Sequence, residues 1–340
     1  MYCGSAEAPP RAALFTGVLV FFLFGCGAGA GPGTSSGAPV VELRRIEFDA
    51  KDQDLKTSGD VILMGVFQLR SDDRRFGGFS GLSLTPDGRL HAISDRGHWM
   101  SATMVSDDEG RLVDLTEWEI GALLTPEGAP VRGRLADAEA LTRDADGSLL
   151  VAFEQAHRLW RYPAPGGFRL PPLPVPLPPE ISKAPANGGL EAITVLPGGR
   201  LLAIAEEFKN ADGSSKGWLI ENGRFAEIAY VPAEGYNPTD CVALNNGDVL
   251  VLERRFFPFG MLRARVARLP AQSLVPGARL VGEELFRVEP PLAAENFEGI
   301  AAWEDPLKGT MIYLVSDDNY LFFQRTLLLQ FRWLRPQRAP

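Results

Sequence analysis

The feature that most constrains this chain is a strand-turn-strand pattern that recurs along it. The stretch Asp137–Gln155, DAEALTRDADGSLLVAFEQ, has two short apolar runs around a Gly-containing turn and a glutamate near each open end. Four further copies are FSGLSLTPDGRLHAISDRG (79–97), GLEAITVLPGGRLLAIAEE (189–207), PTDCVALNNGDVLVLERRF (238–256) and FEGIAAWEDPLKGTMIYLVSDDN (297–319). Self-similarity at a regular period is the signature of a repeat architecture.

The period and the apolar pattern predict a β-propeller. Successive copies begin about 50 to 60 residues apart, which suits one four-stranded blade with its loops. The apolar runs are continuous or alternate, as in strands and not helices. Val40–Phe48, Val61–Leu69 and Leu327–Leu334 also read as strands, whereas Pro163–Pro185 is too rich in proline for a central strand. We therefore predict an all-β propeller of four-stranded antiparallel blades, with five repeats and a sixth, closing blade from the termini.

Acidic residues recur at the open end of each hairpin. Aligned on the turns, the first acidic column is Glu139, Glu191, Asp240 and Glu298, with Ser80 in the earliest copy. The second acidic column is Asp95, Glu154, Glu206, Glu253 and Asp317. Residues equidistant from a tight turn face each other, so both columns lie away from the turns. Blades around one axis would gather these carboxylates in a ring near the mouth of the central channel.

Such a ring needs positive charge, because neighbouring carboxylates raise one another's pKa. Carboxylate oxygens suit Ca²⁺, which takes 6 to 8 oxygen ligands. Ca²⁺ is therefore the predicted cofactor, and its predicted ligands are Glu139, Glu154, Glu191, Glu206, Asp240, Glu253, Glu298 and Asp317. The alternatives are that a bound basic group or the protein's own arginines neutralise the ring.

Arginines follow the second acidic column in two copies. Arg96 comes directly after Asp95, and Arg254 and Arg255 come directly after Glu253. A guanidinium there could hold a phosphate or carboxylate of a substrate in a bidentate contact, or it could pair with ring acids and join blades. Both interpretations stay open.

The predicted catalytic residues are Arg96, His98 and Glu298. His98 is the candidate general acid or base, the role that histidine plays most often. Ser80 could act as a nucleophile, but no base partner is evident beside it. The sequence has no Gly-x-Ser-x-Gly elbow, which disfavours a serine esterase of the α/β-hydrolase kind.

The charge balance disfavours nucleic acid as a partner. The formal net charge is −9, and no basic cluster is present to bind a phosphate backbone. We expect a small-molecule ester or phosphoester substrate and a monomeric protein.

The N-terminus has the pattern of an export signal. Arg11 precedes the apolar run Ala12–Phe24, which is shorter than a spanning helix requires. Leu23–Cys26 resembles a lipobox with Cys26 as the lipidated residue, whereas Ala28–Ala30 offers ordinary cleavage, and both interpretations stay open. We expect a signal at 1–30, a linker at 31–39 and one domain at 40–340. The protein would be periplasmic, or tethered to the bacterial envelope through a lipid at Cys26.

The repeated motifs resemble those of a known family. They are similar to motifs of the phytase-like domain family, which is described by the phrase "esterase-like activity of phytase". The motifs that carry the resemblance are SGLSLTPDGRLHAISDRG, AEALTRDADGSLLVAFE, NGGLEAITVLPGGRLLAIAEE and ENFEGIAAW followed by YLVSDDN. The resemblance covers roughly Val61 to Phe331, and implies a β-propeller, export to the bacterial envelope and hydrolysis of phosphoesters or other esters. The Asp-Asp-Pro-Ala-x-Trp and Asn-Asn-x-Asp-x-Arg motifs of calcium-dependent propeller phytases are absent. The nearest fragment is Glu304–Leu307.

Two functional classes follow from these observations. The first is an exported hydrolase of phosphate or other esters that acts at the acidic ring with Ca²⁺. The second is a non-catalytic envelope propeller that binds a ligand or protein, in which any metal is structural.

Overall fold

The computed structural model describes residues 40–46, 60–257, 261–288 and 295–334. The predicted signal at 1–30, Cys26 and the linker at 31–39 lie outside these residues. Residues 38–340 form one compact unit. Its described part contains strands and short 3-10 helices at Gly133–Leu135, Gly167–Arg169, Pro179–Lys183 and Ala271–Ser273, and no α-helix. No helix in the described ranges has the length and apolar character needed to cross a membrane.

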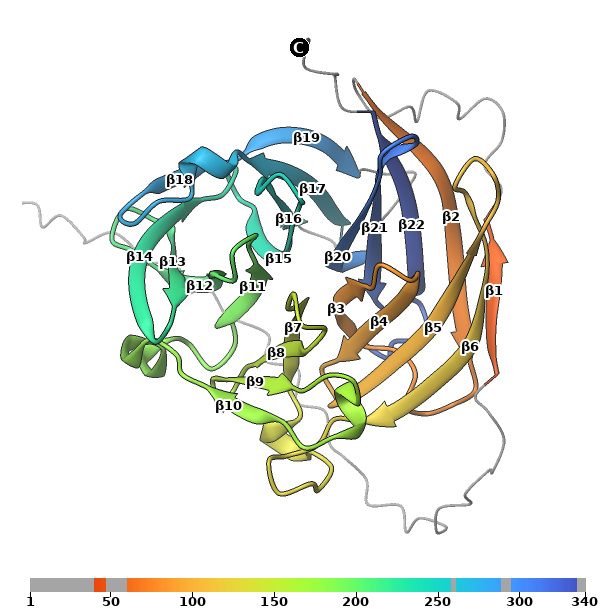
Figure 1. Cartoon of the computed structure of the whole chain (residues 1–340), viewed down its shortest axis with the longest axis horizontal. Coiled ribbons are helices and arrows are strands. Elements are labelled where there is room, and N and C mark those ends of the chain that lie inside the picture. The colour runs from red at the N-terminus through yellow and green to blue at the C-terminus, as the bar shows by residue number, and fades with distance from the viewer. Residues whose placement is uncertain (1–39, 47–59, 258–260, 289–294, 335–340) are drawn as a thin grey trace, which may run out of the picture. The chain divides into compact units, whose positions relative to one another are not determined.

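The strands form five sheets around a common axis, as the blades of a propeller (Figure 1). Blade one contains β3 (Phe79–Leu84), β4 (Arg89–Ser94), β5 (His98–Ser106) and β6 (Leu112–Ala122). Blade two contains β7 (Ala138–Arg143), β8 (Leu149–Phe153), β9 (Arg158–Tyr162) and β10 (Leu173–Val175). Blade three contains β11 (Leu190–Val195), β12 (Leu201–Lys209), β13 (Ser215–Glu221), β14 (Arg224–Val231) and the parallel β18 (Arg279–Val281). Blade four contains β15 (Asn237–Ala243), β16 (Val249–Phe257), β17 (Met261–Leu269) and β19 (Glu283–Val288).

Blade five combines the two ends of the chain. The fifth repeat supplies β20 (Asn296–Asp305), β21 (Gly309–Asp317) and β22 (Thr326–Trp333). β2 (Val61–Ser71) pairs with β22, and β1 (Val41–Arg45) pairs with the outer edge of β2. The prediction of an all-β propeller of four-stranded antiparallel blades is confirmed, with a fifth strand added at the edge of blades three and five, but the count of six blades is wrong. The fifth repeat has only three strands of its own, so the N-terminal strands complete that blade and do not build another.

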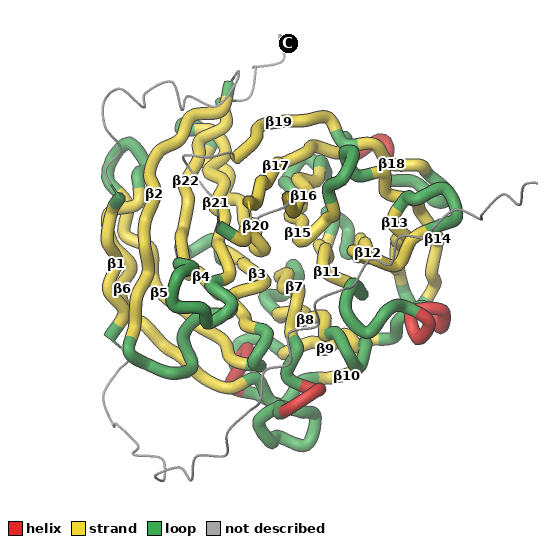
Figure 2. Tube along the Cα trace, turned by 180° about the vertical axis from the view of Figure 1, so that it is seen from behind, coloured by secondary structure: helices red, strands yellow, loops and turns green. Residues whose placement is uncertain are grey.

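The innermost strands are packed tightly around the axis. β3, β7, β11, β15 and β20 contact one another in succession and close the ring, as the views from both sides show (Figures 1 and 2). Small residues allow this approach. A Cβ added to Gly81 of β3 would lie 2.8 Å from the backbone nitrogen of Leu141 in β7. The central channel is therefore narrow where these strands meet.

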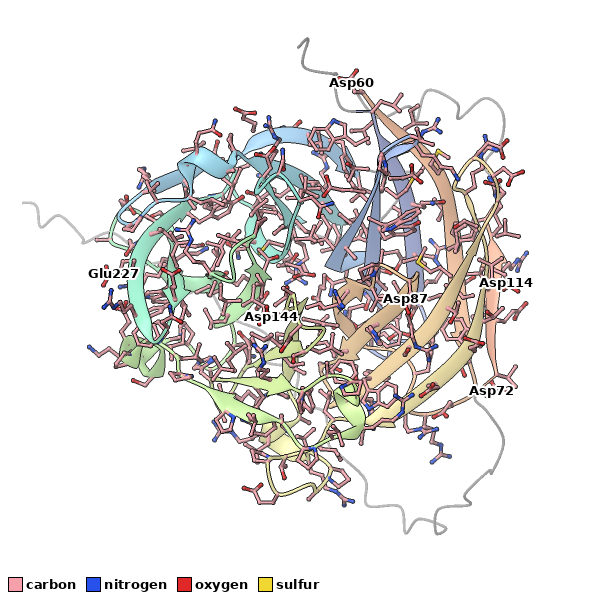
Figure 3. All side chains as sticks on the ribbon, viewed as in Figure 1. Asp60, Asp72, Asp87, Asp114, Asp144 and Glu227 are labelled. Carbon is pink, nitrogen blue, oxygen red and sulfur yellow. The ribbon has the colours of Figure 1, made fainter. Side chains whose placement is uncertain are left out.

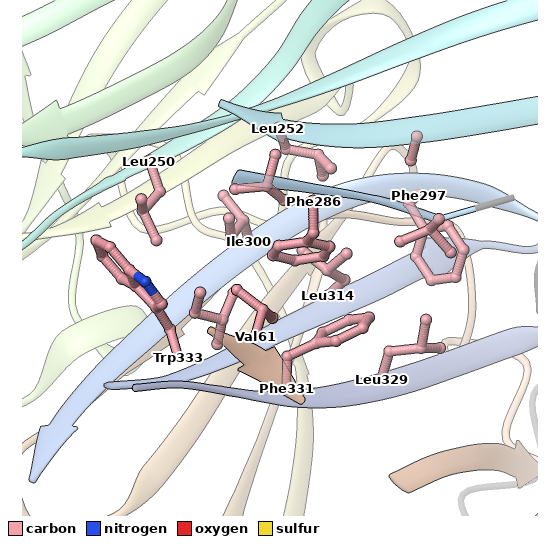
Figure 4. Packing of buried hydrophobic residues seen from close by; sticks show 14 of the residues in the cluster. Val61, Leu250, Leu252, Phe286, Phe297, Ile300, Leu314, Leu329, Phe331 and Trp333 are labelled. Atoms are coloured by element: carbon pink, nitrogen blue, oxygen red, sulfur yellow. The ribbon is translucent and has the colours of Figure 1, made fainter. Parts of the chain in front are cut away.

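Apolar side chains fill the spaces between adjacent blades. In the cluster between blades four and five, Phe286 of β19 and Phe331 of β22 lie with ring centroids 4.5 Å apart (Figure 4). Asp72, Asp114 and Glu227 lie at the periphery of the molecule in the view down the propeller axis (Figure 3). The proline-rich segment contributes β10 as the outermost strand of blade two, an edge position that tolerates Pro174 because no further strand needs its missing N–H.

Candidate functional site

A β-bulge near the start of each innermost strand sets the position of one side chain. In blade two, Ala138 pairs with Phe153 and Ala140 with Ala152, which leaves Glu139 in the bulge. Bulges of this kind redirect a side chain out of the regular ladder. The residues at this position in blades one to five are Ser80, Glu139, Glu191, Thr239 and Glu298. All of them except Thr239 line a single cavity.

The second strand of each blade supplies a further side chain, one residue beyond the pair that precedes the bulge. In blade two this residue is Glu154, whose backbone N donates to the carbonyl of Asp137 at 2.8 Å. The residues at this position in blades one to five are Asp95, Glu154, Glu206, Arg254 and Asp317. All five line the same cavity.

In blade four, the alignment that placed Asp240 and Glu253 in the ring is off by one residue at each position. Pro238 pairs with Glu253 and Asn237 with Arg254, so Thr239 and Arg254 hold the positions that acids hold in blade two. A shift of one residue turns a strand side chain to the opposite face. Neither Asp240 nor Glu253 lines the cavity.

Both displaced acids are buried in the structure between blades. The Asp240 carboxylate accepts the backbone N–H groups of Cys241 and of Ile300 in blade five, each at 2.8 Å. Glu253 accepts the hydroxyl of Tyr230 in blade three and lies 3.3 Å from Nη1 of Arg265. Burial raises the pKa of both carboxyls. These contacts join blades, and they place neither residue among candidate metal ligands.

The cavity has a volume of about 270 Å³, and most of the residues that line it are acidic. Its lining comprises eight carboxylates, one guanidinium and four neutral polar residues. The carboxylates belong to Asp95, Asp137, Glu139, Glu154, Glu191, Glu206, Glu298 and Asp317, the guanidinium to Arg254, and the neutral groups to Ser80, Gln155, Asn187 and Asn319. Every blade contributes, and blade four contributes the positive charge.

Burial and mutual repulsion raise the pKa values of the cavity acids. Burial raises the pKa of Glu139 well above its usual value, and the charges of Glu298 and Asp137 add to this effect. The pKa of Glu191 is also raised well above its usual value, by burial and then by Glu206. A cation bound among these carboxylates would oppose both shifts, because an opposite charge nearby favours the ionised form.

The same causes act on the second set of acids. Burial raises the pKa of Glu154 to about 7, although the N–H groups of Gly188 and Gly189 donate to its Oε1. Burial and the charge of Glu298 raise the pKa of Asp317 to about 8. Burial raises the pKa of Asp95 to about 6, and the nearby Arg96 opposes the shift.

Three carboxylates on the blade-two side lie close enough together to share a cation. One oxygen each of Asp137, Glu139 and Glu154 lies within 4.8 Å of the others. Gln155 Nε2 donates to Asp137 Oδ2 at 2.7 Å and restrains that carboxylate. Oδ1 of Asp95, also in the lining, is buried without a hydrogen-bond partner. Acidic oxygens with an unpaired acceptor nearby fit a hard divalent cation such as Ca²⁺.

Arg254 compensates the acids on the opposite side. Its Nη2 lies 3.1 Å from Glu206 Oε1 of blade three, and its Nη1 donates to Glu298 Oε1 of blade five. Nη1 also donates to Asn296 Oδ1 at 2.6 Å. Burial by itself would lower the pKa of Arg254, but the charges of Glu298 and Glu206 outweigh it and raise that pKa above its usual value. Neutralisation by the protein's own arginine therefore applies to the side formed by blades three and five.

The other basic residues predicted for the site lie outside the cavity lining. Arg96 is exposed and its guanidinium stacks 3.3 Å from the ring centroid of Tyr320. Arg255 Nη1 donates to the carbonyl of Glu234 at 3.1 Å. His98 is half-buried, and burial lowers its pKa, with a further contribution from Arg75. Arg96 and Arg255 are equivalent to each other, one residue beyond the ring position. Arg96 lies in the turn after β4, and Arg255 lies in β16.

Several residues of the cavity lining were not predicted from the sequence. Asp137 lies two residues before Glu139, and the period-2 rule for strands could have placed it on the same side. Gln155 and Asn319 adopt left-handed backbone conformations, with φ of 51° and 47°. Asn187 comes from the loop before β11. No local pattern indicates that these three side chains reach the cavity.

Comparison of the chain with known proteins identifies a family and distantly similar structures. Virginiamycin B lyase from Staphylococcus aureus is 12% identical, with 87% of this chain and 100% of that chain covered and a TM-score of 0.41. The PQQ-bound aldose sugar dehydrogenase from Streptomyces coelicolor is 13% identical, with coverages of 78% and 97% and a TM-score of 0.45. No curated protein sequence matches the chain.

The family assignment rests on a match across the propeller. The profile of the phytase-like family, with the description "Esterase-like activity of phytase", matches residues 74–320, which is more than half of the 340-residue chain. This range contains every residue of the cavity lining. The chain therefore belongs to the phytase-like family.

Proposed function

We propose that the protein is a hydrolase of phosphate or other esters that binds a divalent cation, Ca²⁺ by its chemistry, in the acidic cavity. The observation that carries this proposal is the distribution of charge in the lining. Arg254 compensates the charges of Glu206 and Glu298. The oxygens of Asp137, Glu139 and Glu154 converge on one another, and among the described residues no basic side chain of the lining is paired with them. The family description supports an ester as the substrate class.

The residues of the cavity have separable roles in this proposal. Asp137, Glu139 and Glu154 would hold the cation, which when bound supplies Lewis acidity toward a phosphoryl or carbonyl oxygen. Gly188 and Gly189 fix Glu154 through backbone N–H groups, and Gln155 fixes Asp137. Asp317 has a pKa raised to about 8, so its carboxyl can hold a proton near neutral pH and give or take it during ester cleavage. Burial and the charge of Glu206 shift the pKa of Glu191 in the same direction.

A second candidate function is a ligand-binding propeller without turnover, exported to the envelope. The contacts of Arg254 favour it, because this guanidinium already joins Glu206 of blade three to Glu298 of blade five. In that case the cation would stabilise the fold without assisting a reaction. Export is part of the proposal in both forms, with the protein either periplasmic or anchored to the envelope through a lipid at Cys26.

The deciding experiment is a calorimetric titration of Ca²⁺ into chelator-treated protein, followed by assays with generic phosphomonoesters and carboxyl esters. Glu139→Gln should weaken Ca²⁺ binding by about tenfold or more, because ligand charge sets Ca²⁺ affinity. Glu227→Gln is the matched control, since Glu227 is exposed at the periphery (Figure 3). Calcium-dependent turnover lost in Glu139→Gln supports the hydrolase. Binding of Ca²⁺ that raises the melting temperature without turnover supports the second candidate. Absence of Ca²⁺ binding contradicts both the catalytic and the structural role of the metal.

A further inference from the structure

Three consecutive apolar residues are exposed in the loop between β21 and β22. Leu321, Phe322 and Phe323 form this apolar tip, and their exposed fractions are 42%, 99% and 65%. The other exposed large apolar side chains among the described residues do not follow one another in sequence. Single exposed apolar residues are ordinary in soluble proteins, whereas a contiguous apolar patch marks an interaction site. The apolar tip is therefore a candidate contact surface.

The loop that carries the apolar tip is ordered by hydrogen bonds. The backbone N of Leu321 donates to the carbonyl of Asp318 at 2.7 Å, and that of Gln324 donates to the carbonyl of Leu321 at 3.0 Å. The hydroxyl of Tyr320 donates to the carbonyl of Gly77 at 2.9 Å and ties the loop to blade one. The two phenylalanines thus stay exposed on a fixed base. A tip ordered in advance loses little conformational entropy when it docks.

The apolar tip lies at the end of the propeller where the acidic cavity is. Asp317 and Asn319, at the start of the same loop, belong to the cavity lining. Phe256 of β16 is 64% exposed and follows the lining residue Arg254 by two positions. β16 and β21 are both second from the axis in their blades, and each supplies a lining residue near its C-terminal end. Exposed aromatic side chains from blades four and five therefore lie at the cavity end.

Basic side chains accompany the apolar tip. Arg96 is exposed, and its guanidinium stacks 3.3 Å from the ring centroid of Tyr320 in the same loop. Arg325 follows Phe323 by two residues, and its side chain is 45% exposed although it is paired with Glu295. Aromatic residues settle at the boundary between lipid head groups and acyl chains, and neighbouring basic residues add attraction to anionic head groups. The tip combines both kinds of group on a chain whose net charge is −9.

A lipid surface fits these features better than a protein does. The two phenylalanines of the tip offer at most about 500 Å² of contact area, whereas a stable protein interface buries about 800 Å² on each side. A bilayer needs no complementary pocket for a protruding tip. The proposed lipid anchor would also hold the propeller near a bilayer, since an extended linker from Cys26 to Val40 spans at most about 50 Å.

We propose that the propeller docks on an anionic lipid surface through the apolar tip, with Arg96 and Arg325 against the lipid head groups. This inference goes beyond the proposed function, because it holds whether or not the cavity hydrolyses an ester. It also fixes an orientation. Because Asp317 and Asn319 lie in the loop that carries the tip, the cavity end of the propeller faces the bilayer.

Fluorescence quenching in the full-length chain tests this orientation. Phe322→Trp adds one tryptophan to the six of the chain, and subtraction of the wild-type signal isolates its emission. The vesicles contain phosphatidylglycerol and phosphatidylcholine with brominated acyl chains. The added emission should fall by about half or more relative to unbrominated vesicles, because apolar residues at the boundary reach about 5–10 Å into it.

Leu307→Trp is the matched control for this measurement. Leu307 is 95% exposed and lies in the turn between β20 and β21, at the other end of β21 from the apolar tip. Its added emission should not be quenched by the brominated lipid. Both variants keep residues 1–39, so attachment of the chain through its N-terminus affects them equally and only the orientation of the propeller distinguishes them.

The lipid composition and one arginine test the role of charge. Vesicles of phosphatidylcholine alone, and Arg96→Gln combined with Phe322→Trp, should each reduce the quenching. Equal quenching on vesicles with and without phosphatidylglycerol overturns the assignment of an anionic surface. Equal quenching of Phe322→Trp and Leu307→Trp, or none at Phe322→Trp, overturns the docking itself. The last result is also expected if the tip binds a protein or a second copy of the chain. Ca²⁺ binding and turnover are measured separately, so the proposed function can fail without this inference.

Discussion

At the scale of single residues, the electrostatics of the cavity depends on which carboxylates have a basic partner. Arg254 neutralises acids from blades three and five, whereas Asp317 and Glu154 have raised pKa values of about 8 and about 7. An unfolded chain would ionise these groups near pH 4. The metal-free folded state therefore holds their protons more tightly than the unfolded state does. Their contribution to stability is fully present below about pH 4 and is lost as the pH rises toward 8.

Asp317→Asn should consequently remove part of the pH dependence of stability. The melting temperature of the chelator-treated wild type should fall, relative to that of the variant, by about 2 °C or more between pH 5 and pH 8.5. The amide keeps an oxygen that can accept the N–H of Asn319, the bond that Asp317 Oδ1 makes at 2.6 Å. Asp72→Asn, at an exposed peripheral acid, should follow the wild type at every pH. Identical pH profiles of Asp317→Asn and wild type would contradict the assignment of a raised pKa to this carboxyl.

At the scale of elements, the innermost strands combine a bulge with small residues. The bulge directs Glu139 and its equivalents into the cavity, and the following residue is Gly81, Ala140, Ala192 or Gly299 in all blades except blade four. Blade four has Asp240 there, and its carboxylate binds the backbone of neighbouring strands. A small side chain at this position therefore accompanies the close approach of the strands in blades one, two, three and five, whereas in blade four Asp240 binds the neighbouring backbone instead.

Gly81→Ala should test this close approach. The added Cβ would lie 2.8 Å from the Leu141 nitrogen and 2.9 Å from the Leu141 Cβ, so adjacent blades must move apart. We expect a loss of about 1–3 kcal/mol in the free energy of unfolding, measured with urea. The converse change in blade three, Ala192→Gly, creates no overlap and should cost only about 0.5–1 kcal/mol. Equal stabilities of Gly81→Ala and wild type would show that the strands are less tightly packed than described.

At the scale of the whole molecule, the ring is closed by pairing an N-terminal strand with a C-terminal one. β2 forms an antiparallel ladder with β22 from Val61 opposite Trp333 to Leu69 opposite Thr326. Val61 and Val66 of β2 belong to the apolar cluster between blades four and five. Closure therefore hides the edge of β22 and completes a core at the same time.

Removing β1 and β2 should consequently cost the protein its cooperative fold. A chain without residues 1–72 would expose the edge of β22, and we expect aggregation or a melting transition without cooperativity by circular dichroism. Removal of residues 1–39 leaves both strands and should preserve the melting temperature of the full chain. A cooperative transition of unchanged midpoint in the shorter chain would mean that β22 needs no partner.

Much of this organisation follows from the sequence alone. The alternation within each repeat is a local property, and the regular period requires like units to be stacked, so the propeller class could be predicted. Equal hairpin lengths likewise align Glu139 with Glu191 and Glu154 with Glu206 without any knowledge of the fold. The error in blade four arose because acids lie one residue away from the aligned positions, at Asp240 and Glu253.

Only the tertiary structure decided the blade count, the lining of the cavity and the position of its positive charge. Each depends on contacts between residues far apart in the chain. β2 and β22 pair across more than 250 residues, and Arg254 contacts acids of two other blades. A strand pattern specifies which side chains share a face, but the ladder register determines which face turns to the axis, and register is set by the partner strand. The sequence therefore determined the repeating unit and its acids, and the closed ring determined which of them meet.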